Sequence, residues 1–166
     1  MLGGGGALHN FRIRPIARAR LYSAAPSTEQ IEMPTGRPRI TVLDDNAEFL
    51  ELMSAILDDD AGYDVTTFRE AATSVHDLVE SRPDLVIVDL LLAGASGWEI
   101  VALSRADERL TDVPIVICSA DVASLRDRSD ELERIGNVHM LVKPFGINEL
   151  TELVERLIGR AAVPSD

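Results

Sequence analysis

The sequence predicts an α/β protein with a doubly wound sheet of five parallel strands, each followed by a helix. Two patterns support this prediction for the chain from residue 38 onward. Short β-branched, apolar runs alternate with longer segments whose apolar residues recur at helical spacing. The third run, Leu85–Val88, is entirely apolar, as expected of a parallel strand that is buried on both faces. Alternating strands and helices favour an open sheet covered by helices on both sides.

The first half of this pattern predicts three strands and two helices. The first strand, Arg39–Leu43, is β-branched and stops at two aspartates, and the apolar residues that follow have helical spacing. Gly62 is placed to end the first helix in a left-handed turn. The remaining predicted ranges are Tyr63–Phe68 for the second strand, Ala71–Ser81 for the second helix and Asp84–Val88 for the third strand.

The second half predicts two more strands and three helices. A loop, Leu90–Ser96, leads into a third helix from Gly97 to about Arg105. The apolar residues of the last helix form a single stripe, which indicates one buried face. The other predicted ranges are Val113–Cys118 for the fourth strand, Asp121–Arg134 for the fourth helix, Val138–Val142 for the fifth strand and Ile147–Ile158 for the fifth helix.

Charge separates the beginning of the chain from the rest. Residues 1–37 carry five arginines and two glutamates, whereas the remainder carries eleven basic and twenty-six acidic residues. We therefore expect a disordered Arg/Gly-rich extension over 1–37, one folded domain over 38–160 and a short tail over 161–166. The extension could instead be an organelle transit peptide, a basic arm for RNA or anionic lipid, or an artefact if translation starts at Met33.

The composition of the folded part excludes several classes of protein. Its negative charge should repel nucleic acid and attract cationic partners or metal ions. The apolar runs are too short to span a bilayer. The single cysteine, Cys118, lies in an apolar run and has no second cysteine for an intrachain disulfide, which favours a buried thiol and a reducing, cytoplasmic location.

Polar side chains follow four of the five predicted strands. Asp44 and Asp45 follow the first strand, Asp89 the third, Ser119 the fourth and Lys143 the fifth. With the strand order 2-1-3-4-5, the point where strand order reverses lies between the first and third strands, and ligands bind there, outside the carboxyl ends. We therefore expect three carboxylates, a hydroxyl and an ammonium to converge at this edge.

Such a cluster predicts a site for a divalent cation. Two carboxylates about 5 Å apart repel each other by roughly 3 kcal/mol, and a divalent cation relieves this repulsion. Oxygen ligands, with the remaining positions left to water or phosphate, suit Mg²⁺ better than zinc. Lys143 is the only lysine among sixteen basic residues, and its compact ammonium can enter a small anionic pocket. The alternative is that each aspartate is a helix cap or loop residue and the lysine is incidental.

These motifs resemble the receiver domain of bacterial two-component response regulators. The resemblance covers about Pro38–Gly159 and implies a flavodoxin-like fold. The matching segments are Asp44-Asp45, Val88-Asp89-Leu90 ahead of Gly97-Trp98-Glu99, Ser119-Ala120, and Val142-Lys143-Pro144-Phe145.

The resemblance also implies a role for each residue of the site. Asp89 would accept a phosphoryl group from the phosphohistidine of a sensor histidine kinase or phosphotransfer protein. Mg²⁺ would be bound directly by Asp45, Asp89 and the backbone carbonyl of Leu91, and through water by Asp44. Ser119 and Lys143 would contact the phosphoryl oxygens, and the Lys143–Pro144 bond would be cis.

The residues expected to report phosphorylation depart from the usual pattern. Ser119 would act as a switch together with the residue three positions before the lysine, which is often aromatic in the family and is Met140 here. Methionine adapts its shape but has no ring to swing, so the switch is expected to be softer or rewired.

The length of the chain predicts a stand-alone receiver that acts through other proteins. The expected target surface consists of the fourth helix, fifth strand and fifth helix; a phosphorelay and a homodimer are alternatives. The protein would not be an enzyme beyond its own phosphorylation and dephosphorylation. Two other classes remain: a phosphorylation-independent scaffold, and a small phosphotransfer or hydrolase enzyme, which would need a general acid/base and a substrate pocket that the sequence does not reveal.

Overall fold

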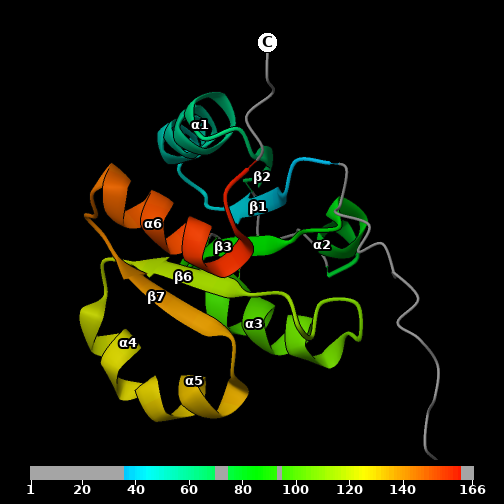
Figure 1. Ribbon diagram of the computed structural model, residues 1–166. Helices are drawn as coiled ribbons and strands as arrows, with labels where there is room; N and C mark the ends of the chain where they lie inside the picture. Colours follow the sequence, from blue (N-terminus) through cyan, green and yellow to red (C-terminus); the bar gives the residue numbers. More distant parts are fainter. Residues whose placement is uncertain (1–35, 70–74, 93–94, 162–166) are drawn as a thin grey trace, which may run out of the picture. The chain divides into compact units, whose positions relative to one another are not determined.

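The computed structural model describes residues 36–69, 75–92 and 95–161 (Figure 1). Most of the expected extension, residues 1–35, lies outside the described residues, as does the tail from 162 to 166. The same holds for 70–74, where the second helix was expected to begin, and for 93–94. The predicted domain limits at both ends therefore stay predictions.

The described residues form one parallel sheet of five strands in the order β2-β1-β3-β6-β7. Each neighbouring pair is parallel, so the carboxyl ends of all five strands lie at the same edge. This confirms the predicted order, and the observed bounds differ from the predicted ones by no more than two residues. The strands are β1 (Arg39–Leu43), β2 (Asp64–Phe68), β3 (Leu85–Asp89), β6 (Ile115–Ser119) and β7 (Val138–Val142).

The segment after β3, which was expected to be a loop, contains a short antiparallel pair. β4 (Leu91–Leu92) pairs with β5 (Ala95–Ser96). The prediction missed this pair because two-residue strands are too short to show an alternating pattern.

Helices cover both faces of the sheet (Figure 1). One apolar cluster packs the sheet against α1, its continuation η1 and α6, and a second cluster packs it against the other helices. The first helix ends in a π-helical turn, which Gly62 terminates with a φ of +79°. The helices are α1 (Ala47–Ser54), η1 (Ala55–Asp60), α2 (Val75–Ser81), α3 (Gly97–Ala106), α4 (Val122–Asp127), α5 (Ser129–Ile135) and α6 (Ile147–Ile158).

The predicted fourth helix, Asp121–Arg134, is wrong as a single element, because the structure has α4 and α5 in its place. The chain breaks at Arg128, whose φ and ψ are −111° and 11°. Leu125 and Leu132 are buried against the sheet, but the six residues between them are all polar. No apolar side chain therefore holds the middle of this segment in helical register. Instead, the Arg128 guanidinium lies 4.9 Å from the centre of the Trp98 ring.

The connection from β3 to α3 is held close to the carboxyl edge by a helix cap and a glycine. Ser96 caps α3, and its own N–H donates to Glu99 Oε2 at 3.2 Å. The Gly97 N–H donates to the Leu90 carbonyl at 3.0 Å. A Cβ at position 97 would lie only 2.5 Å from the Asp89 carbonyl oxygen, so this approach requires glycine.

We therefore predict that Gly97→Ala lowers the free energy of unfolding by about 1–3 kcal/mol, because backbone atoms must move to admit the methyl group. Gly146→Ala is the matched control, since a Cβ there meets nothing within 4 Å. Gly146 is the N-cap of α6, a position at which alanine is slightly less favourable than glycine. We therefore expect Gly146→Ala to change the free energy of unfolding by less than about 1 kcal/mol. Urea denaturation of both variants measures the difference, and equal effects would contradict the close approach.

Candidate functional site

Four polar residues predicted to be functional lie at the carboxyl edge of the sheet. Asp44 follows β1, Asp89 ends β3, Ser119 ends β6 and Lys143 follows β7. The backbone N–H of Lys143 donates to the Ser119 carbonyl at 2.9 Å, which continues the β6–β7 pairing to the base of the lysine side chain. The Lys143–Pro144 peptide bond is cis. The sheet thus brings together residues that are up to 99 positions apart in the chain.

The centre of the site is an ammonium shared by two carboxylates. Lys143 Nζ donates to Asp44 Oδ2 at 2.7 Å and to Asp89 Oδ1 at 3.1 Å. The side chains of Asp44, Asp89 and Lys143 are 2%, 14% and 24% exposed, respectively. Asp44 is therefore a buried charge that requires its partner, whereas Asp89 keeps some access to solvent.

Backbone N–H groups hold the second oxygen of each carboxylate. Asp44 Oδ1 accepts from the Asn46 N–H at 2.8 Å, and Asp89 Oδ2 accepts from the Leu91 N–H at 3.1 Å. Each carboxylate is thus tied to the loop that follows its own strand. These hydrogen bonds fix both side chains before any ligand arrives.

An aromatic pair completes the surroundings of the ammonium. Lys143 Nζ lies 4.0 Å from the centre of the Phe49 ring, a cation–π contact. Phe145 meets Phe49 edge to face, with the ring centres 6.1 Å apart and the planes at 81°. The sequence did not predict this role of Phe49, because the residue belongs to the apolar stripe of the first helix and was therefore expected to be a core residue.

The carboxylates keep Lys143 charged. Burial by itself lowers the pKa of the amine, but the hydrogen bond and charge of Asp44, followed by those of Asp89, outweigh it, and the pKa is raised above its usual value. Cys118 is a buried free thiol, and burial raises its pKa to about 12. This thiol is therefore protonated at neutral pH. The site therefore offers one fixed cation beside two carboxylates.

The structure does not gather every residue that the sequence placed in the site. Among the described residues, no three histidine, cysteine, aspartate or glutamate side chains lie close enough together to hold a metal ion. Asp45 is exposed, and the positive charge between Asp44 and Asp89 comes from Lys143. Ser119 Oγ accepts from the Asp121 N–H at 3.0 Å, within its own turn.

Met140, the other expected switch residue, lies on the edge strand β7. The residue is 43% exposed. Alternation along β6 and β7 places Met140 on the same face of the sheet as Ser119, because Met140 pairs with Ile117 and Ser119 pairs with Val142.

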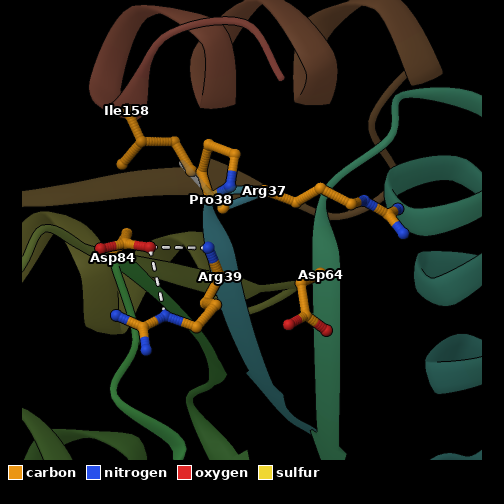
Figure 2. Close-up of a pocket in the computed structure, with 7 residues that line it drawn as sticks. Arg37, Pro38, Arg39, Asp64, Asp84 and Ile158 are labelled. Carbon is orange, nitrogen blue, oxygen red and sulfur yellow. Dashed lines mark hydrogen bonds and ion pairs between the residues drawn. The ribbon is translucent and has the colours of Figure 1, made fainter. Parts of the chain in front are cut away.

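A cavity of about 530 Å³ lies at the opposite, amino edge of the sheet. Figure 2 shows that two of its charged lining residues pair with each other: Asp84 Oδ2 accepts from the backbone N–H of Arg39 at 2.7 Å and lies 3.5 Å from Arg39 Nε. This cavity contains none of the predicted site residues. We therefore place the chemistry at the carboxyl edge and not at this cavity.

The helices of the described chain give no membrane span, since none combines enough length with enough apolar character to cross a bilayer.

Comparisons with known proteins agree on one family. The family model for the response regulator receiver domain matches residues 40–155. The chain is 34% identical over 128 residues to the DNA-binding response regulator MtrA of Mycobacterium tuberculosis strain H37Rv; this match covers 77% of the chain and 54% of MtrA. The chain spans about half the length of the curated relatives it matches.

Two solved structures show the same fold. The chain is similar to the receiver domain of the sensor histidine kinase PA1611 of Pseudomonas aeruginosa, with 27% identity and a TM-score of 0.64 over 75% of this chain and 99% of that one. That crystal structure is described with a magnesium ion coordinated in the active-site cleft. The match to the chemotaxis protein CheY4 of Vibrio cholerae has 24% identity and a TM-score of 0.66, and covers 74% of this chain and 99% of CheY4.

The shared ammonium predicts a strong energetic coupling between Lys143 and Asp44. In a double-mutant cycle with Lys143→Met and Asp44→Asn, we expect a coupling of about 1–3 kcal/mol in the free energy of unfolding, because either single change leaves a poorly solvated group unpaired. The exposed Glu155–Arg160 pair is the control, and solvent screening should make its coupling much weaker. Guanidinium denaturation measures both cycles, and similar couplings would refute the central role of the buried pair.

Proposed function

The chain belongs to the response regulator receiver domains, the phosphoacceptor modules of two-component signalling, and from this premise we propose that Asp89 accepts a phosphoryl group in a Mg²⁺-dependent reaction. The observation that carries the proposal is the contact of one ammonium with both Asp44 and Asp89 at the carboxyl edge. A structural ion pair would not need a second carboxylate at the same ammonium. A phosphoacceptor site does need a nucleophilic carboxylate with a cation beside it.

The proposed reaction transfers the phosphoryl group from nitrogen to oxygen. An Asp89 carboxylate oxygen attacks phosphorus, the bond from phosphorus to the donor imidazole nitrogen breaks with its electron pair, and the product is an acyl phosphate. Lys143 then exchanges its contact with the carboxylate for one with a phosphoryl oxygen, and Ser119 donates its hydroxyl to another. The donor ring leaves as a neutral imidazole when its other nitrogen carries a proton, so no general acid from this protein is needed. Acceleration in such transfers comes from alignment and charge neutralisation.

Mg²⁺ would neutralise the phosphoryl oxygens and the carboxylates as they approach one another. The donor set supports Mg²⁺ over softer metals, because the side chains at this edge offer carboxylate oxygens. We propose Asp45, Asp89 and the Leu91 carbonyl as direct ligands and Asp44 as a ligand through water. Asp44 and Asp89 both contact the ammonium of Lys143, and Asp45, which follows Asp44 directly, is exposed to solvent and could bind a metal ion.

The proposed partners are a sensor histidine kinase or a phosphotransfer protein as donor and another protein as target. The target surface would include α4 and α5, which stand in place of the predicted fourth helix, together with β7 and α6. Ser119 and Met140 would be the switch. Met140 and Val142 support this surface, because β7 is an edge strand and leaves them 43% and 41% exposed. A homodimer could use the same surface.

Three further expectations belong to this proposal. The acidic charge of the chain after residue 37 argues against nucleic-acid binding by these residues, whereas relatives such as MtrA are described as DNA-binding. The reducing environment of the cytoplasm suits the buried free thiol of Cys118. We also propose that the protein acts as a signalling module and not as an enzyme on other substrates.

The phosphoacceptor assignment predicts a single modified residue. Incubation with a small phosphodonor such as acetyl phosphate and Mg²⁺ should add one phosphoryl group, and mass spectrometry after borohydride trapping should map it to Asp89. Asp89→Asn should stay unlabelled. Equal labelling of this variant would reject the assignment, while the absence of labelling and of any response to beryllofluoride would favour a phosphorylation-independent scaffold.

The proposed metal ligands predict a selective loss of Mg²⁺ affinity. Asp45→Asn should raise the Mg²⁺ concentration for half-maximal phosphorylation by at least about tenfold. Removing a residue that only hydrogen-bonds to a metal ligand can already weaken metal binding by this factor, and Asp45 is proposed as a direct ligand. Asp64→Asn, at the amino end of β2, should behave like the wild type. A chelator should abolish labelling, and full labelling in its presence would remove Mg²⁺ from the proposal.

A further inference from the structure

We propose that Phe49 is a positioning residue for Lys143, and that its ring holds the ammonium beside the nucleophile while the phosphoryl group arrives. This inference rests on the proposed function. The observation behind it is the 4.0 Å distance from Lys143 Nζ to the centre of the Phe49 ring. Such a distance lies well within the range of cation–π attraction.

The ring and the two carboxylates together surround the ammonium. An ammonium has three N–H donors, and the hydrogen bonds to Asp44 and Asp89 use two of them. The Phe49 ring lies near the same nitrogen as a third, weaker source of negative potential. The lysine side chain is therefore attracted from three directions.

One contact fixes the backbone at Phe49, and a second holds its ring. Asn46 caps α1, and its Oδ1 accepts from the backbone N–H groups of Glu48 at 3.0 Å and Phe49 at 3.2 Å. The Phe145 ring makes the second contact, with its plane at 81° to that of Phe49. Phe145 follows Lys143 by only two residues, so the loop that carries the ammonium also supports the ring under it.

A ring suits this position because it attracts the ammonium without taking up a hydrogen bond in the way that a carboxylate does. When phosphoryl transfer begins, Lys143 must exchange its contact with Asp89 for one with a phosphoryl oxygen. A third carboxylate would compete for the ammonium during this exchange and would repel the incoming phosphoryl group. A leucine would pack equally well against the apolar cluster but would not attract a cation.

The chain allows a direct test of the contact, because Lys143 is its only lysine. In the full-length protein labelled with isotopic lysine, one set of side-chain NMR signals reports this residue alone. The ε-methylene protons should be shifted upfield by the ring current of Phe49. Phe49→Leu should abolish the shift, Phe49→Tyr should keep it, and Phe145→Leu, which removes the neighbouring ring, should keep most of it.

The same variants test the consequence for the reaction. With acetyl phosphate and saturating Mg²⁺, Phe49→Leu should be phosphorylated about three- to tenfold more slowly than the wild type, the loss expected of one cation–π contact in the transition state. Phe49→Tyr should restore the rate to within about twofold. Urea denaturation identifies folded variants, and Phe49→Met replaces Phe49→Leu if the latter does not fold.

The outcomes separate this inference from the proposed function. A wild-type protein without the upfield shift overturns the positioning role. A shift that is present, combined with a wild-type rate in Phe49→Leu, also overturns it and leaves Phe49 as a core residue. If the shift follows the ring but the wild type is never phosphorylated, the contact stands and the proposed function fails.

Discussion

The structure depends on the ammonium of Lys143, which satisfies Asp44 and Asp89 at once. A carboxylate as buried as that of Asp44 is costly to keep ionised unless a cation and hydrogen bonds compensate for the water it has lost. Lys143 supplies the cation, and the backbone at the start of each following loop supplies the remaining hydrogen bonds. Because the ammonium joins the ends of β1, β3 and β7, it also holds together parts of the sheet that are not neighbours along the chain.

The scaffold contributes rigidity around this contact. Parallel pairing brings the carboxyl ends of the strands to one edge, and the two apolar clusters leave each strand little freedom to move. The β3–α3 connection is held against Asp89 by Gly97 and by the capping box at Ser96. The backbone around the site is therefore held by packing and hydrogen bonds, and the exchange of partners proposed for phosphorylation falls to the side chains.

Membership of the receiver family explains why the charges are arranged in this way, while the particular residues distinguish this chain. Phosphorylation would replace a contact between an ammonium and a carboxylate by one between an ammonium and a phosphoryl group. The change could reach the edge strand β7 through Ser119, which is tied by its carbonyl to Lys143 and lies on the same face of the sheet as Met140. The exposed apolar residues of β7 would present this change to a partner.

The sequence by itself determined the order of strands and helices, and with it the edge at which the aspartates, the serine and the lysine end. Strands such as Arg39–Leu43 and the helix Ile147–Ile158 were predictable because hydrophobic periodicity is a local property of the chain. The break between α4 and α5 and the π-helical end of the first helix were not predicted, because an apolar stripe locates a helix but does not show where its backbone hydrogen bonding changes. Only the tertiary structure decided which carboxylates share the ammonium and that the Phe49 ring lies near it. Each of these contacts joins segments that are far apart in the chain, and their geometry arises from the folded sheet.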